Sequence, residues 1–394
     1  MFSSRLPAKL EANAVSRAID RRRASGATLL DLTQTNPTVV GISYPADVLS
    51  SLSNQQAAVY APDPLGLAEA RSAVADEARA AGITVAASQI VLTASTSEAY
   101  ALLFKLLCNP GDEVLVPQPS YPLFEMLTRL EGIEPVAYRL EHHGAWSIDR
   151  ASLERAMTGR TRAVLAVSPN NPTGSMMRAG DVEWLTGLCA RSGTAIIADE
   201  VFADYELEPG ARAAAGRAAT CGDVLTFSLG GLSKSAGLPQ VKLGWIAVSG
   251  PAALAAAAID RLEHICDTYL SVSTPVQIAA ACLVEAGAGI RAQIAARVSE
   301  NYRHLQQAVA EVGACRLLRT DAGWSAVLQV PTLESEEDLV LHLLENEGVL
   351  AQPGYFYDFP RESFVVVSLI TPPAVLAEGI GRLLRHFDCN VVNP

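Results

Sequence analysis

Short, unbroken apolar runs that end in polar residues dominate the middle of the chain. Residues 161–167 read Thr-Arg-Ala-Val-Leu-Ala-Val and lead into Ser-Pro-Asn-Asn-Pro-Thr-Gly. Residues 194–198 read Thr-Ala-Ile-Ile-Ala and lead into Asp-Glu-Val-Phe. Runs of this kind are typical of strands that are buried on both faces, as in a parallel sheet. The pattern therefore predicts a parallel sheet whose strands end in polar, functional residues.

The order of predicted elements indicates two domains. Strands and helices alternate from about residue 45 to about residue 275, which favours one doubly wound α/β domain with a mainly parallel sheet. Residues 276–310 are predicted to be largely helical, and residues 323–328 and 364–367 are predicted to be strands of a smaller α+β domain. We expect the N-terminal segment to pack with that smaller domain. The predicted division is therefore 45–275 for the large domain and 1–44 with 276–394 for the small domain.

Lys234 is the first candidate for catalysis. It is one of four lysines in the chain and stands among glycines and serines, directly after an apolar strand. A lysine that loses its proton can condense with a carbonyl group, and a loop of small residues would let a cofactor approach it closely. Ligands of parallel sheets bind beyond the carboxyl ends of the strands, so Asn171, Asp199 and Lys234 are predicted to share one site.

Three motifs carry a resemblance to a known family. They are Asn171-Pro172-Thr173-Gly174, Asp199-Glu200, and Ser233-Lys234 followed by Gly244. Their order and approximate spacing are similar to those of the class I/II aminotransferases, which are fold-type I pyridoxal phosphate enzymes. The resemblance covers nearly the whole chain. It implies an aminotransferase-like large domain with a smaller α+β domain, pyridoxal 5'-phosphate as cofactor, and a homodimer.

The resemblance also implies roles for the residues of the predicted site. Lys234 would be the Schiff base lysine and the general base, and Asp199 would keep the pyridine nitrogen of the cofactor protonated. Asn171 would donate its amide to the ring oxygen. Tyr121 resembles the aromatic residue that lies on the face of the cofactor ring.

A phosphate site is predicted where a strand leads into a helix. Residues 93–99 read Thr-Ala-Ser-Thr-Ser-Glu-Ala, and they offer backbone amides and hydroxyl groups at the positive end of a helix. Ser95 and Thr96 are the predicted phosphate ligands. Tyr60 resembles the tyrosine that reaches the phosphate of the neighbouring subunit, which would make the active site a shared one.

The sequence departs from the family pattern at residues that would contact the cofactor, including its phosphate, and at a residue that would bind the substrate. Lys242 stands where an arginine usually binds the phosphate, so the charge is kept but the two-pronged contact is lost. Phe202 replaces a tyrosine that donates to the cofactor. Val366 replaces the arginine that binds the α-carboxylate of the substrate. We therefore expect poor use of aspartate and glutamate and a preference for apolar or aromatic substrates, with Arg361 as the nearest alternative cation in the sequence.

Three functions are compatible with these residues. The first is a pyridoxal phosphate-dependent aminotransferase that acts on a small amino acid or amine and a 2-oxo acid. The second is a lyase or decarboxylase on the same fold, which the missing arginine would favour. The third is a non-catalytic binding or regulatory protein.

Bulk properties exclude several other classes. The 394 residues carry a net charge of −12, which argues against a nucleic-acid partner because no basic stripe is present. The seven cysteines are scattered and lack metal-ligand spacing, as expected of reduced cytoplasmic thiols without a metal. We see no signal peptide, and the alanine-rich run at 252–258 is too short to span a membrane. The sequence predicts a soluble, cytoplasmic enzyme.

Overall fold

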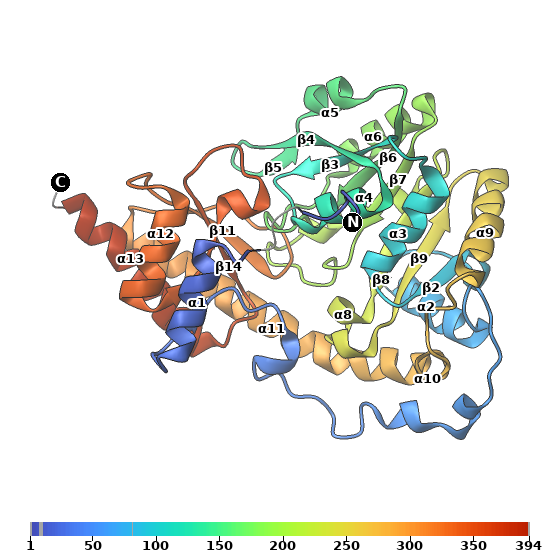
Figure 1. Cartoon of the computed structure of the whole chain (residues 1–394), viewed down its shortest axis with the longest axis horizontal. Helices are drawn as coiled ribbons and strands as arrows, with labels where there is room; N and C mark the ends of the chain where they lie inside the picture. Colours follow the sequence, from blue (N-terminus) through green and yellow to red (C-terminus); the bar gives the residue numbers. More distant parts are fainter. Residues whose placement is uncertain (1, 8–10, 81, 393–394) are drawn as a thin grey trace.

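The computed structural model describes residues 2–7, 11–80 and 82–392, with side chains up to residue 387. Within these residues the strands form one eight-stranded sheet, one four-stranded sheet and one two-stranded sheet. Figure 1 shows the large sheet on the right of the molecule and the four-stranded sheet on the left.

The large sheet is mainly parallel. Its strands, in spatial order, are β2 (Ile90–Thr93), β9 (Gly244–Ser249), β8 (Thr226–Gly231), β7 (Ala195–Asp199), β6 (Thr161–Val167), β3 (Glu113–Gln118), β4 (Glu134–His142) and β5 (Trp146–Ile148). Strands β8, β7, β6, β3 and β4 pair in parallel. Because β2 and β8 are both antiparallel to β9, β2 also runs in the common direction. The carboxyl ends of six strands therefore lie at one edge of the sheet.

Helices cover both faces of this sheet. On one face lie α3 (Thr96–Leu107), α4 (Leu123–Glu131) and α9 (Ala252–Asp267), whose apolar side chains form one core with Phe227 and Leu229 of β8. On the other face lie α2 (Ala68–Ala80), α5 (Arg150–Ala156) and α6 (Ala179–Ser192). Successive residues of a strand point to opposite faces, which explains why these strands are apolar throughout. The observed layers confirm the predicted α/β class.

The second part of the molecule combines the C-terminal elements with the N-terminal segment. Its four-stranded sheet has the order β10 (Arg316–Leu317), β11 (Ser325–Gln329), β14 (Phe364–Ser368) and β13 (Gln352–Pro353). Strand β1 (Leu30–Asp31) pairs in parallel with β12 (Val349–Leu350), as expected for an N-terminal segment that packs with the C-terminal part. The helices here are α1 (Ala14–Ala24), α11 (Ala280–Val312), α12 (Glu336–His342) and α13 (Pro373–Val392). The exact domain limits remain a prediction.

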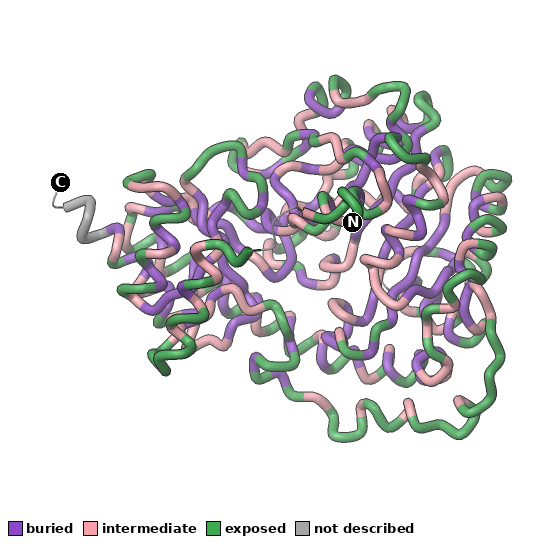
Figure 2. Tube along the Cα trace, in the orientation of Figure 1, coloured by how far each residue is buried: buried purple, intermediate pink, exposed green. Residues whose placement is uncertain are grey.

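Helix α11 joins the two parts, because it contacts both α2 and α13. The described residues also contain three short α-helices: α7 (Ala211–Ala214), α8 (Leu232–Ser235) and α10 (Thr274–Ile278). Residues 43–62 contain short 3-10 turns and no buried residue. This segment runs along the lower edge of the molecule, where Figure 2 shows it almost wholly exposed. Its side chains therefore gain little from packing within the chain.

Two local predictions differ from the structure. Lys234 was expected in a loop of small residues, but it lies on the single helical turn α8. The turn is closed by the Ser235 hydroxyl, which donates to the carbonyl of Gly231 at 3.1 Å, and by the amide of Leu238, which donates to Leu232. The strand predicted at 194–198 begins and ends one residue later, so that Asp199 is its last residue.

Candidate active site

The predicted site residues follow the carboxyl ends of neighbouring parallel strands. Because β2, β8, β7, β6 and β3 run in the same direction, the segments that leave them start at one sheet edge. The structure thereby brings to this edge the residues that end or follow these strands, namely Ser95, Thr96, Lys234, Asp199, Asn171 and Tyr121. Ligand sites of α/β proteins usually lie at this edge of the sheet.

Lys234 lies between aromatic rings. Its Nζ atom is 4.8 Å from the ring centroid of Trp324 and 5.4 Å from that of Phe202. Desolvation by burial lowers the pKa of Lys234 to about 8, although the negative charge of Asp199 acts in the opposite direction. The hydroxyl of Tyr205 donates to the backbone carbonyl of Lys234 and fixes the turn. A lysine in this setting loses its proton more easily than a surface lysine, as a nucleophile or base requires.

Asp199 is a buried carboxyl group at the end of β7. Its Oδ2 atom accepts a hydrogen bond from the hydroxyl of Tyr100 at 2.7 Å, and its Oδ1 atom accepts one from the amide of Val201 at 3.2 Å. Burial raises the pKa of Asp199, while the bonds from Tyr100 and Val201 and the charge of Lys234 lower it. The sequence prediction missed Tyr100. The available signal was its position one helical turn after Thr96, which places both residues on the same side of α3.

Asn171 is oriented by a residue from the second part of the molecule. The hydroxyl of Ser325, in β11, donates to Oδ1 of Asn171 at 3.2 Å. This bond uses the side-chain carbonyl oxygen of Asn171 and does not involve the two N–H donors on Nδ2. The peptide bonds before Pro169 and Pro172 are cis, which shapes the turn that carries Asn171. Ser325 was also missed by the sequence prediction.

The turn before α3 has the features of an anion site. Ser95 is the N-cap of α3, where its hydroxyl accepts from the amide of Glu98 at 3.2 Å, and Thr96 is the first helical residue. The Glu98 carboxylate accepts from the amide of Ala94 at 2.6 Å and from the hydroxyl of Ser271 at 2.8 Å. The start of β9 packs against this turn, since a Cβ atom at Gly244 would lie 3.1 Å from the carbonyl carbon of Ser95.

Lys242 stands just before this contact. It is exposed and has a left-handed backbone with a φ of 60°. Its position two residues before Gly244 places its backbone close to the start of β9, and hence on the side of the sheet edge where α3 begins. The side chain of Lys242 is exposed, and its backbone lies two residues before the contact between Gly244 and Ser95.

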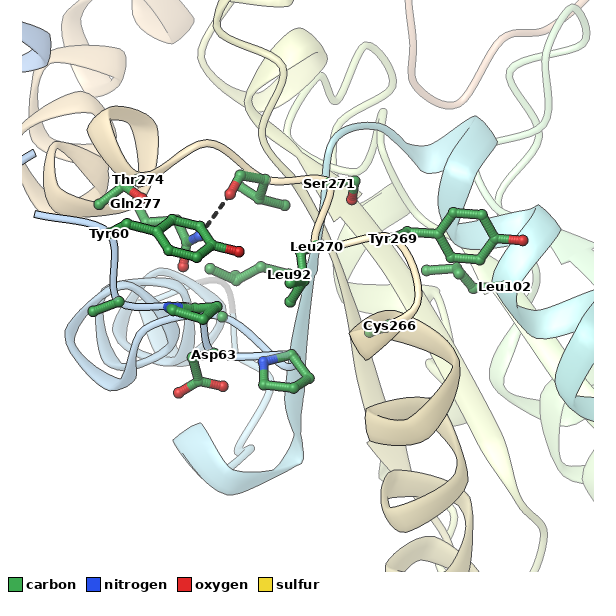
Figure 3. A pocket seen from close by; sticks show the side chains of 15 residues that line it. Tyr60, Asp63, Leu92, Leu102, Cys266, Tyr269, Leu270, Ser271, Thr274 and Gln277 are labelled. Atoms are coloured by element: carbon green, nitrogen blue, oxygen red, sulfur yellow. Dashed lines mark hydrogen bonds between the residues drawn. The ribbon is translucent and has the colours of Figure 1, made fainter.

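Tyr121 and Tyr60 are exposed, with relative exposures of 43% and 76%. Tyr121 precedes α4, and the amide of Ser120 beside it donates to the carbonyl of Tyr357 at 3.0 Å. Tyr60 instead lines a surface pocket, which Figure 3 shows with Tyr60 near Thr274 and Gln277 on one side and Tyr269 near Leu102 on the other. The lining residues do not include Lys234, Asp199 or Asn171. Within one chain, Tyr60 is thus not brought together with them.

Comparison with known proteins identifies the family. A model of the family described as aminotransferase class I and II matches residues 29–383, which is most of the chain. The chain belongs to this family. The match confirms the resemblance predicted from the three motifs and makes the protein a transferase.

Relatives of this aminotransferase are similar to it over almost their full length. An alanine aminotransferase of Mycobacterium tuberculosis is 26% identical and covers 92% of this chain and 86% of its own. A glutamate-pyruvate aminotransferase of Haemophilus influenzae is 27% identical and covers 93% of both chains. A human tyrosine aminotransferase is 26% identical and covers 92% of this chain and 82% of its own. None of these three is named as a lyase or decarboxylase, so the comparisons favour transamination.

The fold of this aminotransferase is shared with solved structures. A crystal structure of an Escherichia coli aminotransferase superimposes with a TM-score of 0.86 and 23% identity, and covers 98% of each chain. An alanine aminotransferase of Pyrococcus furiosus gives a TM-score of 0.86 at 22% identity, with 98% of this chain and 99% of its own covered. These similarities confirm the fold.

The position of the missing arginine is apolar in this aminotransferase. Val366 in β14 is buried, and it packs in one cluster with Trp146, Phe359 and Phe364. Arg361 lies on the exposed loop before β14, and its guanidinium is 5.6 Å from the ring centroid of Phe364. The guanidinium of Arg361 therefore does not lie at the position of Val366.

Two kinds of feature are absent from the described residues. No group of three or more His, Cys, Asp or Glu side chains in this part of the chain is arranged to hold a metal ion. None of the helices in the same residues has the length and apolar character that crossing a membrane requires.

Proposed function

We propose that this aminotransferase binds pyridoxal 5'-phosphate, with Lys234 as the residue that attaches the cofactor covalently. The observation that carries the proposal is the setting of Lys234: an amine with a pKa lowered to about 8, held at the sheet edge next to a buried aspartate. When bound, pyridoxal phosphate supplies an electron sink that stabilises negative charge on the carbon next to the amino group. The chain must supply the proton transfers and the positioning.

The donor set fits each part of this cofactor. The buried Asp199 carboxylate suits a protonated ring nitrogen, and the Nδ2 group of Asn171 suits a ring oxygen. The N-terminus of α3, with Ser95 and Thr96, suits the phosphate, and the exposed Lys242 adds positive charge. Tyr121 has an exposed ring that can lie on the face of the cofactor.

Lys234 would act as the general base. A neutral amine can remove a proton from the α-carbon of the substrate and return it to a different carbon of the reacting system. Its lowered pKa places the neutral form within reach near physiological pH. The rings of Trp324 and Phe202 lie beside Nζ and would reduce its contact with water.

Peptide mapping after borohydride reduction tests the cofactor site. Borohydride fixes the cofactor on its lysine, and we expect the label on the peptide that contains Lys234. The variant Lys234→Ala should show no label, whereas the matched control Lys105→Ala, which removes a lysine on α3 paired with Glu131, should label as the wild type does. A label on any other lysine of the wild type contradicts the proposal.

The proposed substrates are an apolar or aromatic amino acid and a 2-oxo acid. The relatives carry the names of alanine, glutamate-pyruvate and tyrosine aminotransferases. In this chain the buried cluster around Val366 disfavours a substrate carboxylate at that position, because an unpaired anion there would cost on the order of several kcal/mol.

A half-reaction screen tests the substrate proposal. Each amino acid is added alone, and the loss of the bound cofactor's absorbance is followed. We expect alanine, leucine, phenylalanine and tyrosine to react faster than aspartate and glutamate. Efficient reaction of aspartate with 2-oxoglutarate that survives Arg361→Ala would contradict both the apolar site and the alternative cation.

We also infer a homodimer with shared active sites. Residues 43–62 are exposed along one edge, and Tyr60 and Tyr269, with relative exposures of 76% and 53%, border a cavity that this chain alone leaves open to the surface. A second copy covering this edge would bring its Tyr60 to the phosphate site. The free state of the six cysteines with described side chains and the acidic charge favour a cytoplasmic location without a nucleic-acid partner.

Subunit mixing tests the shared site. Lys234→Ala and Tyr60→Ala are each expected to have low activity as pure proteins. In a mixed dimer both changes fall in one site, so the other site is intact, and about a quarter of the wild-type activity should return after subunit exchange. Absence of recovery in a mixture that contains mixed dimers would show that Tyr60 serves its own subunit.

A further inference from the structure

Tyr100 donates a hydrogen bond to the carboxylate of Asp199. Its side chain is buried, with a relative exposure of 2%, and its hydroxyl donates to Oδ2 of Asp199 at 2.7 Å. The ring is held by Phe104 and Phe124, at centroid distances of 6.0 and 5.3 Å. The phenol therefore has little freedom to leave the carboxylate.

The helix that carries Tyr100 also carries the predicted phosphate ligands. Tyr100 lies one turn after Thr96 in α3, and Ser95 is the N-cap of the same helix. Asp199 and the anion site at the start of α3 are thereby joined through a single rigid element. A ligand that spans the two would be anchored at both ends by α3, at one end directly and at the other through Asp199.

The bond from Tyr100 affects the basicity of Asp199. A hydrogen bond donated to a carboxylate stabilises its charged form and makes it a weaker base. Burial has the opposite effect, since it raises the pKa of Asp199. When a carboxylate and a ring nitrogen share one proton, the stronger base holds it. A buried carboxylate without a donor would compete for that proton, and the donor reduces this competition.

We propose that Tyr100 is a positioning residue which, through its hydrogen bond to Asp199, keeps the shared proton on the ring nitrogen of the cofactor. This inference rests on the proposed pyridoxal phosphate site. Tyr100 does not touch the cofactor or the substrate in this proposal, because its hydroxyl is occupied by Asp199. It acts on the electron-accepting capacity of the ring, which depends on the charge at that nitrogen.

The test is nitrogen-15 NMR of the holoenzyme loaded with cofactor labelled at the ring nitrogen. In the wild type we expect the resonance of a protonated ring nitrogen. In Tyr100→Phe the resonance should move toward the unprotonated position, with a change in the ratio of the two forms of about tenfold, as for the loss of one hydrogen bond to a charged group. The apparent kcat should fall while the KM for the amino donor changes little.

The matched control is Tyr138→Phe. Tyr138 is also buried, and its hydroxyl donates to the carbonyl of Leu165 at 2.9 Å, away from Asp199. This variant removes the same group and a similar bond, so it should share any loss of stability but leave the nitrogen resonance unchanged. If both variants move the resonance equally, or if neither does, the inference is overturned.

A second variant covers the case in which Tyr100→Phe does not fold. Incorporation of fluorotyrosine at position 100 keeps the shape of the ring but makes the phenol a stronger donor. The resonance should then move further toward the protonated position, and a shift in the other direction overturns the inference. Failure of the wild type to carry the cofactor on Lys234 would instead refute the proposed function, so the two outcomes are distinguishable.

Discussion

Replacing Lys234 by methionine should make the cofactor-free protein more stable at neutral pH. The folded state lowers the pKa of Lys234 from the ordinary value of 10.5 to about 8, mainly by desolvation. Below pH 8 the lysine is protonated in both states, so the folded state bears the full cost of a desolvated charge. Between pH 8 and 10.5 only the unfolded chain holds this proton, so the stability of the wild type rises with pH. Above pH 10.5 the cost is absent.

The size of this effect follows from the two pKa values. The difference between 10.5 and about 8 corresponds to about 3 kcal/mol, at about 1.4 kcal/mol per pH unit. For 394 residues, an unfolding entropy of about 2.1 cal/mol/K per residue converts this energy into a change of about 4 °C in Tm. Methionine has a similar volume and fits an apolar setting between Trp324 and Phe202. Asp199 loses a neighbouring cation, but its carboxylate keeps the hydrogen bonds from Tyr100 and Val201.

Thermal unfolding of the cofactor-free wild type and of Lys234→Met from pH 7 to pH 11 measures the effect. The variant should unfold at the higher temperature at pH 7, and the difference should shrink through the window from pH 8 to 10.5. Lys242→Met, which removes an exposed lysine, is the control and should show no such pH-dependent gain. A variant that is less stable than the wild type at pH 7, or a difference that does not change with pH, would refute the assignment of a desolvated charge to Lys234.

Three further predictions concern Phe202, Gly174 and Val366. Phe202→Tyr should lower the pH midpoint of the bound cofactor's absorbance change, because a phenol can donate a hydrogen bond to the cofactor and phenylalanine cannot. An absorbance titration measures the midpoint. An unchanged or raised midpoint contradicts the position assigned to Phe202. Gly174→Ala should destabilise the protein by about 2–4 kcal/mol, because φ of Gly174 is +66° and the new Cβ would lie 2.2 Å from Cγ2 of Thr320. Urea unfolding measures the loss of stability. The control is Gly180→Ala, because no atom lies within 4 Å of a Cβ added there. Val366→Arg should lower the unfolding midpoint without raising aspartate turnover, because it buries an unpaired guanidinium beside Phe359 and Phe364, and rapid aspartate turnover by a stable variant would contradict the apolar cluster.

The sequence predicted the sheet and the edge at which the site lies. The run at 161–167 coincides with β6, because an unbroken apolar segment of that length has few alternatives to a doubly buried strand. Once the strands are parallel, the residues after them must start from one edge, and Asn171, Asp199 and Lys234 follow from that rule. Position along the chain is therefore enough to predict that these three residues lie at one edge of the sheet.

The contacts that tune these residues could not be predicted in the same way. Tyr100 and Asp199 are 99 positions apart, and Ser325 and Asn171 are 154 apart. In the sequence, Tyr100 stands in an apolar helix between Ala99 and Leu102 and is typical of a core residue, which it also is. Its second role depends on the rotation of α3 about its axis and on its distance from β7. Both are set by packing of the whole layer rather than by a local pattern.

The same layer packing explains why the substrate end of the site cannot be read from the family pattern. Val365 and Val367 point into the core that contains α11 and α13, while Val366 points into the cluster with Trp146, Phe359 and Phe364. Strand β14 is thus buried on both faces, and a charged side chain on it would need a buried partner that neither cluster supplies. Arg361 has water around it and an aromatic ring beside it, so it gains little by moving to that position. We therefore expect recognition of a substrate carboxylate in this aminotransferase to come from residues outside β14.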